Sequence, residues 1–219
     1  LSNHFLVVGA EYKEAELKDG IYKDGKKEYN QYGVFAEDNW NIIDPLTLTL
    51  GTRYDKHEDF GDNVSPRVYA TYAINDNWTV KGGVATGYKT PKTTDLQEGV
   101  VGFGGQGTSP QFGNPDLKPE KSLSKEVAVY YEHPDKHNFN VTLFQNNFKD
   151  KIESTDFSAN VPSEWSGFVD PANPPKQKQN VGKAEILGLE AAGKFFILDN
   201  LSIKANWTWL DSEIKSDDS

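Results

Sequence analysis

The feature that most limits how this chain can fold is a series of about nine segments in which apolar and polar residues alternate one by one. They are rich in Val, Thr, Tyr, Phe and Trp, as strands are. In LTLTLGTRYDK, Leu48 and Leu50 fall on one face and Thr49 and Arg53 on the other, because successive strand side chains point to opposite faces. The segments are residues 4–17, 29–42, 46–56, 65–74, 78–89, 126–133, 138–152, 184–198 and 201–210. We predict an all-β chain, an antiparallel up-and-down meander of about nine strands.

The connections between these segments alternate between short and long. IDPL, NDN, HPDKHN and DN form short turns, and residues 18–28, 57–64, 90–125 and 153–183 form long connections expected to lack regular structure. Long structureless connections are rare in soluble domains, whereas outer-membrane barrels have short turns at one rim and long loops at the other. This rhythm favours part of a large transmembrane β-barrel. A soluble sandwich or barrel is the alternative that the alternation by itself leaves open.

Composition narrows the classes of partner. The chain has 33 Asp and Glu against 23 Lys and Arg, a net charge of −10, which argues against nucleic acid as a ligand. It contains no cysteine, so disulfides and cysteine-based zinc sites are excluded. No segment approaches the roughly 18 consecutive apolar residues that a membrane helix needs.

Six motifs occur along the chain: GTRYD (51–55), SPRVYATY (65–72), GYKTPK (87–92), GNPDLKPEKS (113–122), FKDKIES (148–154) and NVGKAEILGLE (180–190). Together they resemble the barrel of TonB-dependent outer-membrane receptors, nearest to the ferric-siderophore branch. The resemblance implies that residues 1–219 are part of a barrel of about 22 strands. It also implies that the plug domain and the C-terminal strands of such a barrel are absent from this chain.

The resemblance further implies a function and a location. It predicts energised uptake of an iron–siderophore complex through the outer membrane of a Gram-negative bacterium, with the ferric siderophore as transported ligand and no covalent cofactor. Outer-membrane lipid, lipopolysaccharide and the TonB energy-coupling complex, reached through the plug, are the expected partners. A porin-like outer-membrane channel and a soluble engineered antigen displaying receptor loops remain alternatives. No catalytic set of side chains is evident, so an enzyme is not expected.

The segment GNPDLKPEKS is predicted to be a rigid post between a long loop and the next strand. Its two prolines fix φ and extend the residues before them. Asn114 and Asp116 offer side-chain caps for turns, and Glu120 and Lys121 are candidates to anchor the start of the strand. We expect a structural post with no direct contact to ligand.

Two groups of side chains are candidate functional residues. A ferric catecholate is large, aromatic and anionic, so aromatic and lysine side chains in the long connections suit it. These candidates are Lys18, Tyr22, Lys23, Lys26, Lys27, Tyr88, Lys92, Phe103, Phe112, Trp165 and Phe168. The second group is expected to face the lumen and the plug, and comprises Arg53, Asp55, Arg67 and Glu190. Asp55 and Glu11 are the expected partners for the two arginines within the wall.

Two further patterns have plain explanations. GFGGQG (102–107) matches a nucleotide-binding fingerprint, but no helix can follow it in TSPQFGNP, so we expect a flexible extracellular loop. His133 and His137 have a spacing used by metal ligands on helices, but Pro134 and the turn around it oppose a helix. We expect no metal site.

Overall fold

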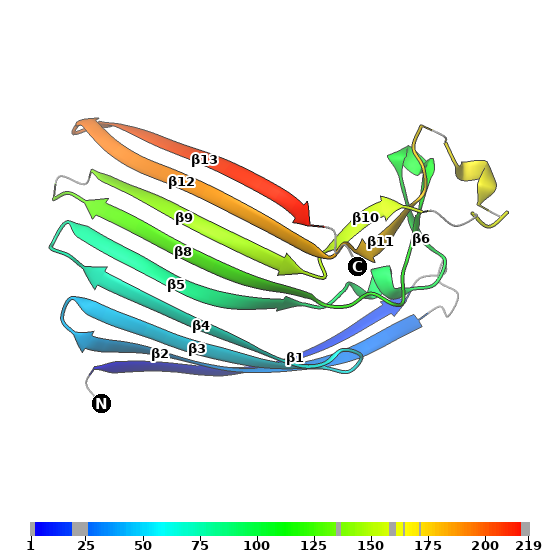
Figure 1. Ribbon diagram of the computed structural model, residues 1–219, viewed down its shortest axis with the longest axis horizontal. Helices are drawn as coiled ribbons and strands as arrows, with labels where there is room; N and C mark the ends of the chain where they lie inside the picture. Colours follow the sequence, from blue (N-terminus) through cyan, green and yellow to red (C-terminus); the bar gives the residue numbers. More distant parts are fainter. Residues whose placement is uncertain are drawn as a thin grey trace.

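The computed structural model describes residues 3–18, 26–134, 137–157, 161–163, 165–170 and 172–215. Nine long strands form one antiparallel sheet, the main sheet, in the order β1-β2-β3-β4-β5-β8-β9-β12-β13 (Figure 1). Their bounds are β1 His4–Lys18, β2 Lys26–Ile43, β3 Leu46–His57, β4 Gly61–Ala73, β5 Trp78–Lys89, β8 Glu120–Glu132, β9 Asn138–Lys149, β12 Lys183–Leu198 and β13 Leu201–Lys215. The predicted all-β meander of nine strands is confirmed, with every strand in its predicted order.

The alternation in the sequence gives the main sheet two different faces. Leu48 is in register with Trp40 and with Ala70, and Leu143 with Val127 and Leu189. These residues belong to the apolar face, whose side chains are largely uncovered; Leu143, for example, is 46% exposed. The residues between them form the polar face, which carries both arginines. The apolar face is therefore not packed against other parts of the chain. This is expected when a different apolar medium covers that face.

The short turns lie at one end of the main sheet and the longer connections at the other (Figure 1). One connection differs from the prediction, because β3 and β4 are joined by residues 58–60 alone rather than by a long loop at 57–64. The strand β4 begins at Gly61, and Asp62 and Asn63 pair with β3. Gly, Asp and Asn are common in turns, so the sequence pattern predicts a loop where the strand in fact continues.

The two longest connections were predicted to lack regular structure, and this prediction is wrong. They contribute a second, four-stranded sheet, the loop sheet, in the order β10-β11-β7-β6. Its strands are β6 Val100–Gly104, β7 Ser109–Phe112, β10 Ile152–Asp156 and β11 Lys176–Asn180, with 3-10 turns η1 Thr93–Leu96, η2 Gly105–Gly107 and η3 Ser166–Phe168. The segment GFGGQG, predicted to be a loop, forms the end of β6 and the 3-10 turn η2 in the connection to β7. Among the described residues, no helix has the length and apolar character to cross a membrane.

Candidate ligand-binding site

The loop sheet joins the two longest connections into one body beyond the long-loop end of the main sheet (Figure 1). The strand β7 of the first connection pairs in parallel with β11 of the second, with Lys176 opposite Gln111 and Gln177 opposite Phe112. Phe112 also stacks on Phe157, with ring centroids 4.1 Å apart. Hydrogen bonds thus connect segments 65 residues apart in sequence, and the ring contact adds a second link between the two connections.

Asn114 and Asn180 hold this junction together. The side chain of Asn114 accepts a hydrogen bond from the backbone N–H of Asp116 at 3.0 Å and donates one to the carbonyl of Lys178 at 3.1 Å. The carboxamide of Asn180 accepts from the N–H of Lys118 at 2.9 Å and donates to the Lys118 carbonyl at 3.0 Å. Asn180 also donates to the carbonyl of Asp150 at 2.6 Å. The turn cap predicted for Asn114 is confirmed, and Asn180 is a junction residue that sequence reasoning did not identify.

Glu120 fixes the start of β8, as the sequence predicted. One of its carboxylate oxygens accepts a hydrogen bond from the backbone N–H of Ile152, and the other from the ammonium of Lys89, both at 2.7 Å. The segment GNPDLKPE therefore joins the first long connection to β8 and binds the second through hydrogen bonds. That it makes no ligand contact itself remains a prediction.

The junction brings two of the predicted ligand residues together. Phe103, from the β6–β7 hairpin, and Trp165, beside η3, lie with ring centroids 5.6 Å apart. Phe103 is 39% exposed, so this aromatic pair presents part of its surface outward. Exposed, preorganised aromatic faces can stack on aromatic or cationic ligand groups.

The other candidates in these two connections lie in different settings. Phe112 is only 4% exposed and packs inside the loop sheet, so its ring is a core residue rather than the surface contact that had been expected. Tyr88 is half-buried, and its hydroxyl is enclosed without a hydrogen-bond partner among the described residues. Lys92 is exposed immediately before η1. The side chain of Phe168 lies outside the described residues.

Two candidate lysines flanking the first connection, Lys18 and Lys26, are paired with carboxylates. Lys18 contacts Glu16, and Lys26 contacts Glu28 and lies 3.5 Å from Glu16. The charges of Lys18 and Lys26 are therefore compensated by the carboxylates of Glu16 and Glu28. Tyr22, Lys23 and the side chain of Lys27, predicted to act with them, lie outside the described residues.

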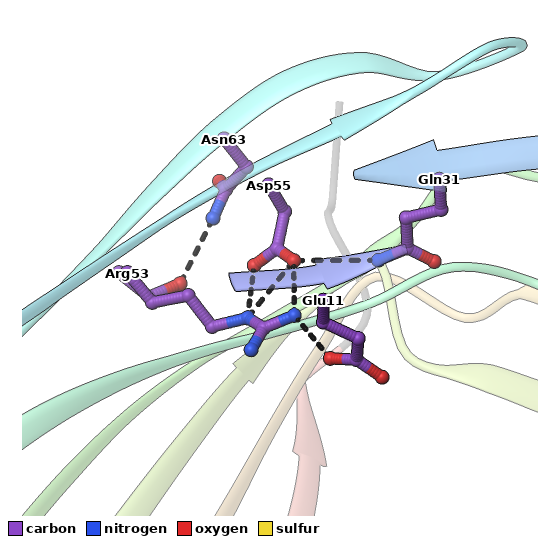
Figure 2. A network of polar contacts seen from close by, with 6 residues as sticks. Glu11, Gln31, Arg53, Asp55 and Asn63 are labelled. Carbon is purple, nitrogen blue, oxygen red and sulfur yellow. Dashed lines mark hydrogen bonds and ion pairs between the residues drawn. The ribbon is translucent and has the colours of Figure 1, made fainter. Parts of the chain in front are cut away.

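A polar network occupies the polar face of β1–β3 (Figure 2). The Arg53 guanidinium donates to Asp55 at 2.9 Å and to Glu11 at 2.8 Å. Gln31 donates to the same Asp55 carboxylate at 3.4 Å. Asp55 is 5% exposed, so its charge depends on these donors, whereas a third of the Arg53 side chain is exposed. With two carboxylates on one guanidinium, the network is a structural element of the wall and has no excess positive charge for an anionic ligand.

The remaining lumen candidates share this face. Arg67 lies 3.2 Å from Glu37 on β2, a partner that sequence reasoning did not name. Glu190 is exposed on the polar face of β12, in register with Thr142 and Thr208. Contact of these side chains with a plug remains a prediction. Among the described residues no group of three or more His, Asp or Glu side chains could hold a metal ion.

Comparison with known proteins gives a consistent result. The family model described as TonB dependent receptor-like, beta-barrel matches residues 3–219. The iron-regulated outer membrane virulence protein of Vibrio cholerae serotype O1 is 33% identical over 99% of this chain and 33% of its own length. The ferric enterobactin receptor of Pseudomonas aeruginosa is 32% identical over 94% of this chain and 31% of its own length. The chain thus spans about a third of the length of these curated relatives.

Solved structures agree with the sequence relatives. The siderophore receptor PirA from P. aeruginosa superposes with a TM-score of 0.76 at 26% identity, covering 95% of this chain and 37% of that one. The R480A mutant of the ferric enterobactin receptor PfeA from the same species, solved in complex with enterobactin, gives a TM-score of 0.75 at 27% identity over 96% of this chain and 34% of that one.

Proposed function

This chain belongs to the TonB-dependent receptor β-barrel family, and we propose on that basis that the protein carrying it takes up ferric siderophores across the outer membrane. The nine strands of the main sheet would be part of the barrel wall, with the apolar face toward lipid. Residues 1–219 would form one partial barrel domain. The proposal assigns the chain no catalytic step and no covalent cofactor.

The observation that carries the proposal is the joined architecture of the long connections. They form one ordered body at a single end of the sheet, and this body presents the aromatic pair Phe103 and Trp165. A body of this kind suits capture of a large aromatic ligand outside the membrane. A ferric catecholate is the favoured ligand, since a related receptor was solved with enterobactin bound. Coupling to TonB would proceed through a plug domain seated against the polar face.

The test uses the complete receptor in detergent. Ferric catecholate, ferric hydroxamate and haem are titrated separately, following intrinsic tryptophan fluorescence and retention of radioactive iron. We expect one ferric catecholate to bind at submicromolar concentration. Phe103→Ala should weaken its binding by about 3- to 10-fold, which corresponds to the loss of one aromatic contact.

Phe196→Ala provides the matched control. Phe196 lies near the short-turn end of β12, at the opposite end of the main sheet from the loop sheet (Figure 1). It should leave binding unchanged. If none of the three ligands binds and the receptor instead conducts ions in planar bilayers, the receptor function is wrong and the porin-like channel is favoured.

A further inference from the structure

Two lysines stand directly opposite each other on the polar face of the main sheet. Lys194 of β12 is in register with Lys204 of β13, and they form the fourth pair from the turn that joins these strands. Lys194 has the side-chain parity of Glu190, so both lysines belong to the polar face. This set, the lysine pair, lies near the short-turn end of that face, opposite to the end that carries the loop sheet (Figure 1).

The lysine pair differs from other cations of the polar face because no carboxylate compensates it. A carboxylate lies within 4.0 Å of each of Arg53, Arg67, Lys81 and Lys89. Among the described residues, neither Lys194 nor Lys204 has a carboxylate within that distance. On the same row of partners, Glu132 of β8 is separated from Lys194 by Asn138. Like charges on directly opposed strand positions repel, so an anion between the two ammonium groups would stabilise the pair.

The Lys194 ammonium also lies over an aromatic ring. It is 4.3 Å from the centroid of the Phe196 ring. This contact attracts the cation to the ring face but adds no negative charge. Both positive charges of the lysine pair therefore remain available to a ligand.

Uncharged hydrogen-bonding groups complete the surroundings of the lysine pair. Asn140 of β9 and Asn206 of β13 are opposite Ala192 of β12 on its two sides. In the part of the chain that the structure describes, neither carboxamide forms a side-chain hydrogen bond. The short side chain of Ala192 leaves a hollow, and a cavity of about 410 Å³ is lined by both lysines and both asparagines. This volume is within the range of small-molecule sites, about 300–1,000 Å³.

The donors around this cavity suit a ligand with anionic oxygen atoms. An ammonium group has three N–H donors and no acceptor, and a carboxamide adds two N–H donors. Hydrogen bonds from charged donors to charged acceptors are stronger than those between neutral groups. Two ammonium groups would repel a metal cation, and a purely apolar ligand would leave them unpaired. The chemistry therefore selects a carboxylate, a phosphate or a catecholate.

We propose that the lysine pair, with Asn140 and Asn206, is an exit site that binds the anionic ferric catecholate as it leaves the lumen. The inference rests on the proposed function, which puts the polar face in the lumen and the short turns on the periplasmic side. Capture takes place at the loop sheet, so the ligand meets the exit site only after it has passed along the wall. A carboxylate of the plug is the other source of such an anion, and the test separates the two.

The test uses cells that make the complete receptor and have no other route for the ligand. Initial binding of radioactive ferric catecholate is measured on de-energised cells, and its uptake rate at saturating ligand on energised cells. Changing both lysines to glutamine should leave the initial affinity unchanged. It should lower the uptake rate by about tenfold, the effect of losing one charge-assisted contact. Such a loss of rate without loss of initial affinity indicates an interaction made after the first binding step.

Two further variants separate charge from folding and from position. Changing both lysines to arginine should retain uptake, because the positive charges remain. The matched control is Lys56→Gln combined with Lys125→Gln, which removes two exposed lysine charges from the apolar face. The control should take up the ligand at the parent rate. An equal loss in the control would overturn the exit site, and so would full uptake by the glutamine variant.

Ion conductance in planar bilayers identifies the source of the anion. The purified glutamine variant should be as closed as the parent when no ligand is present. A variant that conducts ions without ligand would have lost an anchor for the plug, which overturns the exit site. Import by the parent with equal import by the glutamine variant rejects the exit site alone. A parent that neither binds nor imports the ferric catecholate rejects the proposed function, and the exit site with it.

Discussion

Gly33 shows how a single small residue lets the polar face hold its charged network. It lies in register between Glu11 of β1 and Asp55 of β3, and the Arg53 guanidinium crosses directly over it. A Cβ atom added at Gly33 would lie 2.3 Å from a guanidinium nitrogen of Arg53. Gly51 has the same relation to the Arg67 side chain, whose Cγ would lie 2.7 Å from an added Cβ. Glycine thus allows both arginines to lie flat against the wall.

Gly33→Ala should therefore displace the guanidinium and leave the buried Asp55 carboxylate short of a donor. We expect a loss of about 1–3 kcal/mol in the free energy of unfolding, the usual cost of a weakened buried polar contact. Urea unfolding of the complete receptor in lipid vesicles measures it. Gly82→Ala is the control, since the nearest atom to its added Cβ is 3.4 Å away. Equal stability of the two variants would contradict this account of Gly33.

Glu153 of β10 provides a pH-dependent contact in the loop sheet. A hydrogen bond from Lys151 is the main reason that the pKa of the Glu153 carboxyl is lowered from its ordinary value. Because the folded-state pKa is the lower one, the contact stabilises the loop sheet above the ordinary glutamate pKa. This stabilisation is lost as pH falls through the lowered value. The effect is small because the Glu153 side chain is 41% exposed.

The measurement is carbon-13 NMR of the labelled Glu153 carboxyl during an acid titration. In the parent, half-titration should occur below the ordinary glutamate value, and Lys151→Ala should move it upward. Lys92→Ala, a distant exposed lysine, should leave it in place. Coincident titration curves for the parent and Lys151→Ala would show that this lysine does not set the pKa.

Between elements, Asn180 is the residue that couples the two longest connections. Its carboxamide makes three hydrogen bonds, two to Lys118 and one to Asp150. Each such bond contributes about 1 kcal/mol, so Asn180→Ala should make local opening easier by about 2–3 kcal/mol. Amide hydrogen exchange in β11 and around Lys118 should then accelerate by about 30- to 150-fold.

The control for this prediction is Asn206→Ala, which removes an exposed carboxamide from β13 far from the junction. It should not alter exchange in the loop sheet. If Asn180→Ala also left exchange unchanged, parallel pairing of β7 with β11 would be sufficient to join the connections. Ligand affinity should follow exchange, because a loosened junction must be reordered on binding.

The sequence predicted the long elements well and the junction poorly, for a physical reason. The nine long strands were recognisable because apolar and polar residues alternate over many positions in each of them. This period of two places the apolar side chains on one face only in a strand. The loop strands have four or five residues each, too few for a period to be distinguished from chance. Their pairing also depends on residues in another loop, so no local pattern marks Asn180 as a partner for Lys118. The Arg53 network was partly predictable because Asp55 lies on the same strand face.

At the scale of the whole molecule, the decisive property is that one face is apolar and the other polar over all nine strands. The main sheet does not close on itself: β1 and β13 are its two edges. A bilayer does not tolerate unpaired strand edges, so the edges require the rest of a barrel. Under the proposed function, the exposed apolar face would be the lipid-facing wall and the polar face would be the lumen side.

Two adjacent residues of β9 test this orientation directly. Leu143 is on the apolar face and Thr142 on the polar face, about midway between Phe139 and Lys149. Leu143→Arg would put a charge into the hydrocarbon and should destabilise the receptor by about 2–4 kcal/mol. Thr142→Arg would face the lumen and should cost far less. Urea unfolding in lipid vesicles measures both variants. A greater loss for Thr142→Arg would mean that the faces are reversed.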